Sequence, residues 1–285
     1  MFVHDPSACL ISQTLLRERS WEERELTVVL TALLSGSAAG FFLDIGSNIG
    51  VYALSAAAAG IPTVAFEPLT FNVELLAASA ALARRRKVPL LAVHAAVAAT
   101  PSRTPVCVRP FNTHATKAAA NAGNGQLSLG ASPSSVGESS ACASGELVTV
   151  TTVDTVLSSD PTLAAACFTA AKVDVEGYEA AALRGASGVL GGRCPPCLVF
   201  LETQPAVAAS VGFGKSEAFD VLNGHGFRCR PIVLKKKEQR DFACWRPAVT
   251  PRCREPVAAA KACLATTGHR LCKAYVEHAV LVRTG

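Results

Sequence analysis

Phe41-Phe42-Leu43-Asp44-Ile45-Gly46-Ser47-Asn48-Ile49-Gly50 is the stretch that decides the fold of this 285-residue chain. Apolar residues run into an acid, and small residues then alternate with apolar ones. This pattern predicts a buried strand, a tight turn and the first turn of a helix. Gly46 and Gly50 have no Cβ, so the turn can tighten and the helix can pack close to the strand. Helix N-terminal N–H groups would then point into a crevice beyond the strand, where a small polar or nucleotide-like ligand fits.

The acid in this turn distinguishes between classes of ligand. A dinucleotide-binding turn has the order G-x-G-x-x-G, whereas this one has the order Asp44-x-Gly46-x-Asn48-x-Gly50. A carboxylate in front of the glycines would repel a pyrophosphate and would attract a cation or hydroxyl groups. The motif therefore indicates a ligand with an ammonium group, such as S-adenosylmethionine, rather than NAD.

A second acid follows the next predicted strand, Thr63–Phe66, which Glu67 and Pro68 end. The two oxygens of Glu67 could accept both hydroxyls of a ribose whose other end lies on the first turn. Pro68 keeps Glu67 out of a helical conformation. Taken alone, Glu67 would be a solvated acid at a strand end, but its spacing from Asp44 favours a ligand site.

Charged residues also mark a later strand, predicted over Ala170–Val175. Alternation places Lys172, Asp174 and Glu176 on one side of this strand. Three charged groups are costly to bury unless they line a crevice or pair with one another. We expect Asp174 and Glu176 at the substrate end of the site, as a base or as hydroxyl or metal ligands, and Glu202, at the end of the next predicted strand, as a third candidate. The alternative is a Lys172–Asp174 pair that only neutralises itself.

Three stretches together resemble the FkbM-type methyltransferases: Asp44–Gly50, Ala65–Pro68 followed by Asn72, and Lys172–Gly177. They follow the order and spacing of that family over about residues 20–205. The resemblance implies an α/β fold of the Rossmann-like class I methyltransferase type, with a mainly parallel seven-stranded sheet and helices on both faces. It also implies S-adenosylmethionine as the cofactor and, most often, O-methylation of a hydroxyl on a small molecule or a sugar.

We therefore expect the first two motifs to bind the cofactor and the carboxylates further along the chain to act on the substrate. No residue is assigned to a metal. The expected cofactor-binding residues are Asp44, Gly46, Ser47, Asn48, Gly50, Glu67 and Pro68, and the expected catalytic residues are Asp174, Glu176 and Glu202.

Two other functions fit the same kind of sheet. One is a nucleotide-dependent oxidoreductase, against which the missing third glycine of G-x-G-x-x-G and the acid Asp44 both argue. The other is a non-catalytic binding or scaffold module that has kept the fold, against which the intact motifs argue. The expected partner is a small-molecule or carbohydrate methyl acceptor, and the oligomeric state stays open.

The chain divides into three parts in this interpretation. Residues 1–40 form a covering helix region, with a capping box at Ser20–Glu23. Residues 41–234 form the methyltransferase core, which carries a long insertion at 98–145. The insertion is rich in Ala, Ser, Gly and Asn and is expected to be a mobile loop near the crevice. Residues 235–285 are a basic, Cys-bearing segment with a closing strand of the same domain.

The end of the predicted sheet and one histidine complete the expectations for the core. Phe227–Leu234 and Tyr275–Val282, the latter with His278, are expected to be the closing antiparallel strands. Asp154, after a predicted strand, could be a helix cap or a site residue. His94 lies in an apolar strand, where a satisfied core histidine is more common than a catalyst.

Charge and hydropathy exclude several classes of partner. The net charge of +5 is spread along the chain, and the basic runs Arg84–Lys87 and Lys235–Lys237 have few aromatic neighbours, which argues against nucleic acid. No segment approaches the ~20 apolar residues that a membrane span needs. The first residues do not form a signal peptide, so we expect a soluble, cytoplasmic protein.

The sequence contains 11 cysteines. Cys107 and Cys167 lie in apolar stretches and are interpreted as small core residues. Cys194-Pro-Pro-Cys197 has redox or half-zinc spacing but no second such motif, so we expect a surface turn. The C-terminal cysteines could form disulfides only in an oxidising compartment.

Overall fold

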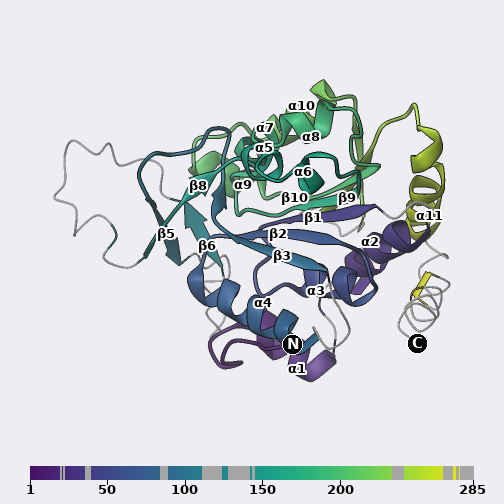
Figure 1. The fold of residues 1–285 in the computed structure, drawn as a ribbon. Helices are drawn as coiled ribbons and strands as arrows, with labels where there is room; N and C mark the ends of the chain where they lie inside the picture. The colour runs from purple at the N-terminus through teal and green to yellow at the C-terminus, as the bar shows by residue number, and fades with distance from the viewer. Residues whose placement is uncertain are drawn as a thin grey trace.

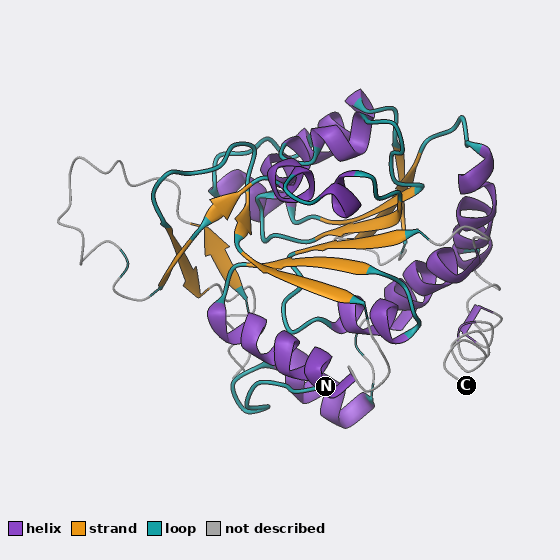
Figure 2. Cartoon of the chain, in the orientation of Figure 1, coloured by secondary structure: helices purple, strands orange, loops and turns teal. Residues whose placement is uncertain are grey.

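A seven-stranded sheet with helices on both faces forms the centre of the protein (Figures 1 and 2). The structure, a computed structural model, describes residues 1–19, 21, 23–35, 40–83, 89–110, 124–127, 142, 145–232, 241–265, 272–273 and 276. The predicted fold class is therefore confirmed.

The sheet has the strand order β11-β12-β10-β9-β1-β2-β3. The strands from β10 to β3 run parallel, and β12 is antiparallel to both β10 and β11. The chain leaves β1 toward β2 on one side and later returns to β9 on the other, so the order reverses at β1 and opens a crevice beyond the carboxyl ends of these strands. The strands are β1 (Phe41–Ile45), β2 (Thr63–Glu67), β3 (Leu90–His94), β9 (Phe168–Val173), β10 (Leu198–Glu202), β11 (Arg228–Pro231) and β12 (Asp241–Trp245).

Alternating apolar residues give the sheet two buried faces. Phe42 and Phe200 belong to one core cluster, whereas the neighbouring Leu43 and Leu201 belong to another. The first face carries α1 (Leu10–Glu18), α2 (Glu23–Ser35), α3 (Val51–Ala58), α4 (Thr70–Ala83) and α11 (Arg254–Leu264). The second face carries α5 (Val153–Ser158), α6 (Pro161–Ala164), α7 (Glu179–Arg184), α8 (Ser187–Gly191), α9 (Pro205–Ser210) and α10 (Glu217–Gly224).

The closing strands differ from those that the sequence predicts. The strand expected over Phe227–Leu234 is present as the shorter β11, but its antiparallel neighbour β12 comes from residues 241–245. β12 was not predicted, and the strand expected at Tyr275–Val282, with His278, falls outside the described residues apart from Val276. β12 is short and follows a polar run, which is why periodicity did not reveal it.

The insertion at 98–145 contains more regular structure than the predicted loop. Its described part includes β5 (Val106–Pro110) and β6 (Gly125–Leu127). β5 is the central strand of a three-stranded antiparallel sheet and pairs with β6 on one side and with β7 (Glu146–Val148) on the other. A second small pair joins β4 (Ala96–Val97) to β8 (Val150–Thr151) in parallel. Residues 111–123, 128–141 and 143–144 of the insertion lie outside the described residues.

Ten of the cysteines form disulfides, among them Cys107 and Cys167, so these two are not simply small core residues. Cys107 pairs with Cys142, and Cys167 pairs with Cys194. The two cysteines of the Cys194-Pro-Pro-Cys197 turn are bonded to different partners, which excludes a disulfide or a metal clip between them. The remaining pairs are Cys197–Cys253, Cys229–Cys244 and Cys263–Cys272, and Cys9 is in no disulfide.

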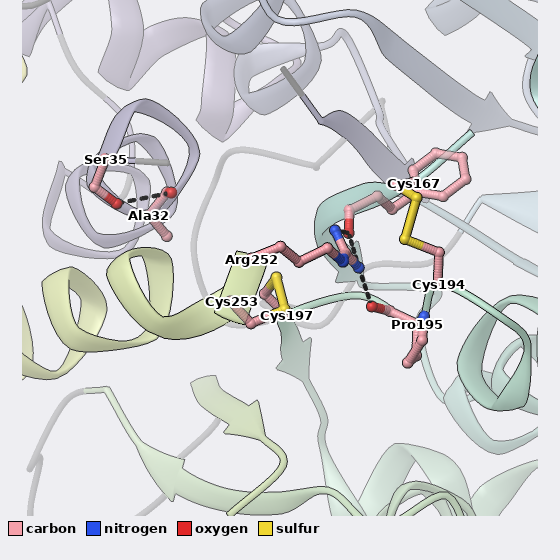
Figure 3. The surroundings of a disulfide bond; sticks show 9 residues. Ala32, Ser35, Cys167, Cys194, Pro195, Cys197, Arg252 and Cys253 are labelled. Atoms are coloured by element: carbon pink, nitrogen blue, oxygen red, sulfur yellow. Dashed lines mark hydrogen bonds between the residues drawn. A yellow bond between two sulfur atoms is a disulfide. The ribbon is translucent and has the colours of Figure 1, made fainter. Parts of the chain in front are cut away.

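Arg252 lies between two of these disulfides, Cys167–Cys194 and Cys197–Cys253 (Figure 3). Its guanidinium donates to the Phe168 carbonyl oxygen at 3.2 and 3.3 Å and also to the carbonyl oxygen of Pro195. The segment before α11 is thereby fixed to the start of β9 and to the turn before β10. This position at the amino ends of the strands is opposite the crevice, so the contacts stabilise the sheet without reaching the site.

Some predicted features lie outside the described residues, namely Ser20 of the capping box and both basic runs. The helix expected after that box is present as α2, and α1 in front of it was not predicted. His94 is not a core residue: its side chain is 44% exposed, and Nε2 lies 2.9 Å from the Pro68 carbonyl oxygen. It is exposed because β3 is an edge strand with a partner on one side only.

The disulfide pairing has a direct chemical test. In denaturant without reductant, we expect thiol titration to find one reactive thiol per chain, that of Cys9, and 11 after reduction. Cys9→Ala is the matched control and should leave no reactive thiol before reduction. Several reactive thiols in the unreduced wild-type protein would contradict the pairing.

Candidate active site

A cavity of about 390 Å³ opens at the carboxyl ends of β1, β2, β9 and β10. This volume lies within the usual range for small-molecule sites. The cavity brings together nine of the ten residues that the sequence predicts for the site, and Gly50 is the exception. The nine are Asp44, Gly46, Ser47, Asn48, Glu67, Pro68, Asp174, Glu176 and Glu202.

The turn after β1 explains why glycine is needed at two positions. Gly46 has φ +84°, and a Cβ there would lie 1.8 Å from the carbonyl oxygen of Asp174. Gly50 has φ +87°, is the N-cap of α3, and would place a Cβ 2.3 Å from Leu76 Cδ1. Gly46 thus lets two motifs approach each other at the cavity, whereas Gly50 allows α3 to pack against α4.

Glu67 is buried and accepts hydrogen bonds from three protein groups. Oε1 accepts from the Leu69 N–H at 3.1 Å and from Asn72 Nδ2 at 2.8 Å, and Oε2 accepts from the Asn48 N–H at 2.8 Å. The two lone pairs of Oε1 are therefore occupied, while Oε2 has one acceptor site left. We therefore expect Glu67 to accept one ribose hydroxyl, on Oε2, and not two.

Asp44 and Ser47 present buried polar atoms to the cavity. Within the described part of the chain, neither carboxylate oxygen of Asp44 nor Oγ of Ser47 has a hydrogen-bond partner. Asp44 is 1% exposed and Ser47 6%. Buried polar groups are normally satisfied, so this pair indicates a ligand that donates hydrogen bonds. An ammonium group and a hydroxyl both fit.

Burial also shifts the titration of these acids. The pKa of Asp44 is raised to about 6. Burial is the main cause and nearby Asp174 contributes, while the attraction of the Lys172 ammonium opposes the rise. The Ala53 N–H lowers this pKa without reaching hydrogen-bond geometry. Burial likewise raises the pKa of Glu67 to about 7, although the hydrogen bond from Asn72 opposes it. A bound cation would favour the ionised form of both acids.

The third motif is only partly strand. β9 ends at Val173, so the prediction that Asp174 and Glu176 alternate along the same strand was wrong. Lys172 Nζ lies 2.7 Å from Asp174 Oδ2, as the alternative interpretation proposed, yet Asp174 also lines the cavity. Glu176 has φ +51°, a left-handed conformation that is strained for a residue with a side chain.

A buried carboxylate holds this strained turn in place. Glu179 Oε1 accepts from the Gly177 N–H at 2.9 Å and from the Val175 N–H at 3.4 Å. Burial raises the pKa of Glu179 to about 7. The turn that carries Glu176 is thus fixed from its inner side, and Glu176 points toward the cavity.

Asn124 lines the cavity and was not predicted as a site residue. Its Nδ2 donates to Glu176 Oε1 at 2.5 Å, and its Oδ1 accepts from Asn48 Nδ2 at 3.3 Å. Gln126 Nε2 donates to the Glu176 carbonyl oxygen at 3.0 Å. The insertion therefore connects the cofactor turn to the predicted catalytic acid. The available signal in the sequence was the Gly-rich stretch around Asn124, but this part of the insertion was predicted to be a loop.

The N-terminal region also forms part of the cavity wall. Trp21 packs on the core and also lines the cavity. Leu10, Ile11 and Thr14 of α1 line it too. No local sequence signal marks these residues, because their position depends on the docking of α1 against distant elements.

The cavity is strongly acidic although the chain is basic. Among the described residues that line it, Lys172 is the cation, and six are acids. Such a lining favours cationic and hydroxylated ligands over phosphates. The acids are Asp44, Glu67, Asp174, Glu176, Glu202 and Asp241.

The described residues offer no metal site, and Asp154 has a structural role. The described residues contain no group of three or more His, Cys, Asp or Glu side chains that could hold a metal ion. Asp154 accepts from the Gly188 N–H at 2.7 Å and the Val189 N–H at 3.1 Å. It therefore caps the start of α8 and lies away from the cavity.

Comparison with known proteins bears on the same region. The model of the methyltransferase FkbM domain matches residues 44–229, and no curated protein matches the chain. The crystal structure of methyltransferase FkbM from Methylobacillus flagellatus KT is 14% identical with a TM-score of 0.44, and the match covers 73% of this chain but only 43% of that one.

Two further solved structures are more distant. A putative tRNA methyltransferase from Streptococcus pneumoniae is 10% identical, with a TM-score of 0.38 and coverage of 93% of this chain and 100% of that chain. The [4+2]-cyclase SpnF is 14% identical, with a TM-score of 0.34 and coverage of 98% and 76%.

The buried acids predict that the protein becomes more stable as the pH falls, which can be tested. The folded-state pKa values of Asp44, Glu67 and Glu179 lie above their ordinary values of 3.8, 4.5 and 4.5. The folded state therefore binds protons first as pH falls, and these groups stabilise it progressively from about pH 8 to about pH 5. We expect the urea midpoint to rise over this interval.

Asp44→Asn should show the same effect at constant pH. It removes a buried charge that no described residue hydrogen-bonds, so at pH 8 we expect a gain in unfolding free energy of up to roughly 3 kcal/mol. Glu74→Gln, which removes an exposed acid of α4, is the control and should leave the pH profile unchanged. A midpoint that falls steadily from pH 8 to pH 5 would contradict the assignment.

Proposed function

Since the FkbM domain model matches residues 44–229, this chain belongs to the FkbM methyltransferase family, and we propose that it transfers a methyl group from S-adenosylmethionine to a hydroxyl of a small molecule or carbohydrate. The observation that carries the proposal is the buried Asp44 carboxylate, which faces the cavity with no hydrogen-bond partner among the described residues. A cationic ligand would satisfy it, whereas a pyrophosphate would not.

The residues of the first two motifs fit this cofactor. Asp44 would accept from its ammonium group, and Glu67 Oε2 would accept from one ribose hydroxyl. Ser47 Oγ supplies a further polar partner, and Pro68 borders the cavity beside Glu67. When bound, the cofactor supplies a methyl group on a sulfonium, which is the electrophile of the reaction.

The carboxylates beyond β9 and β10 would act on the acceptor. Glu176 is the best placed to take the proton of the acceptor hydroxyl, because Asn124 holds one of its oxygens and the turn is fixed from behind. Asp174 and Glu202 would orient the hydroxylated acceptor through hydrogen bonds. Transfer is an in-line displacement, so alignment and the exclusion of water contribute most of the rate enhancement.

The charge of the cavity also limits the acceptor. In the described lining, six acids against one lysine disfavour a nucleic-acid backbone and favour an uncharged or cationic hydroxyl compound. We propose that 1–40, 41–234 and 235–285 act as one domain with this single site. This division is supported by the lining residues that all three parts contribute, Trp21 and Asp241 among them.

The disulfides bear on the compartment. Five bonds involving ten cysteines are typical of proteins that fold in an oxidising environment. We therefore favour an oxidising compartment over the cytoplasmic location expected from the sequence, and an acceptor that is present there. Within the described ranges, no helix is long and apolar enough to cross a membrane.

Calorimetric titration tests the cofactor assignment. Wild-type protein should bind S-adenosylhomocysteine and should not bind NADH. Glu67→Gln should weaken the affinity for S-adenosylhomocysteine by about tenfold or more, since a charged hydrogen bond to a ribose hydroxyl contributes about 1.5–3 kcal/mol. Glu74→Gln, on the exposed face of α4, is the matched control and should bind as wild type does.

Other outcomes of this titration would overturn parts of the proposal. Binding of NADH alone would favour the oxidoreductase, and unchanged affinity in Glu67→Gln would remove Glu67 from the site. Binding of S-adenosylhomocysteine without any methyl transfer, across an extract fractionated by compound class and supplied with labelled S-adenosylmethionine, would favour a binding module.

The role of Glu176 can be separated from cofactor binding. Once an acceptor fraction is found, Glu176→Gln should lower kcat by about 100-fold or more, because it removes a general base. It should leave the affinity for S-adenosylhomocysteine within about threefold, since Glu176 is not assigned to the cofactor. Equal loss of both would show that Glu176 maintains the cavity rather than accepting the proton.

A further inference from the structure

The first residues of the chain are attached to α4 beside the cofactor motif. The Phe2 N–H donates to Ser79 Oγ at 2.7 Å, and His4 Nε2 lies 2.6 Å from Asn72 Oδ1. His4 is 4% exposed, and its ring packs edge-on against Phe71, with 4.7 Å between the ring centroids. These residues precede the region that the family model matches.

The hydrogen bonds at Asn72 have a fixed direction. The side chain is fully buried, and its Nδ2 donates to Glu67 Oε1 at 2.8 Å. Asn72 Oδ1 must then face His4. Because this oxygen can only accept, the His4 ring must carry its hydrogen on Nε2 and donate it. A continuous relay therefore runs from His4 through Asn72 to the carboxylate of Glu67.

This relay determines which oxygen of Glu67 is available to a ligand. Asn72 and the Leu69 N–H fill Oε1, so that Oε2 keeps the open acceptor position at the cavity. Without His4, the buried Asn72 carbonyl oxygen would lose its donor, and the amide could turn or admit water. The carboxylate would then no longer be held in one orientation.

We propose that the N-terminal segment, residues 1–21, completes the cofactor-binding site, with His4 as a positioning residue that acts on Glu67 through Asn72. The same segment contributes Ile11 and Trp21 to the cavity wall, which is an independent observation. The expected effect on the affinity for S-adenosylhomocysteine rests on the proposed function. The family core alone would thus bind the cofactor weakly.

The test is calorimetry with S-adenosylhomocysteine on the full chain. His4→Ala should weaken the affinity about threefold to tenfold, as expected for one buried hydrogen bond. Glu74→Ala is the matched control, because Glu74 is exposed on α4 and takes no part in the relay. In an Asn72→Ala background, His4→Ala should have no further effect on affinity.

Thermal unfolding and amide exchange keep the outcomes distinct. If His4→Ala lowers the melting temperature but leaves the affinity unchanged, or if its effect persists in the Asn72→Ala background, the relay is refuted. Exchange of the Asn72 side-chain amide protons in the ligand-free protein should be slow in wild type and faster in His4→Ala. If wild type fails to bind S-adenosylhomocysteine, the proposed function fails, and unchanged exchange in His4→Ala would still refute the relay.

Discussion

The close approach of Gly46 to the carbonyl oxygen of Asp174 is the constraint on which the site depends. No side chain fits between them, because a Cβ on Gly46 would lie 1.8 Å from that oxygen. The Gly46 and Ser47 N–H groups donate to the Phe66 carbonyl oxygen, and the Asp174 N–H donates to that of Ile45. The ends of β1, β2 and β9 are thereby joined, and the acids that follow them meet at one cavity.

This arrangement is costly without a ligand. Burial raises the pKa of Asp44 and of Glu67, which means that the folded protein destabilises their charged forms. Glu67 is partly compensated by three donors, whereas Asp44 accepts no hydrogen bond from the described residues. A fold selected for stability alone would neutralise such a group. Its retention is the physical reason to regard this edge of the sheet as a binding site, since a cationic ligand would offset the cost.

The sequence revealed the parts of the site that are local in the chain. The stretch from Phe41 to Gly50 shows its strand, its turn and its acid within ten residues, and Glu67 follows one strand later. The contact between His4 and Asn72 spans 68 residues, and that between Asn124 and Glu176 spans 52. No periodicity encodes such pairs, because they depend on how distant elements dock. Disulfide connectivity is hidden for the same reason, since many pairings fit one set of cysteines.

The segments outside the matched core also change what the site can be. The core supplies most of the lining, but Trp21 precedes it and Asp241, on β12, follows it, and both line the cavity. The Cys197–Cys253 disulfide and Arg252 fix the segment before α11 to the central strands, and α11 in turn packs on α2. The walls contributed by the two ends of the chain are therefore held against the same sheet. Parts of the cavity wall therefore come from the two ends of the chain, so the ligands that fit the cavity depend on these outer residues as well as on the matched core.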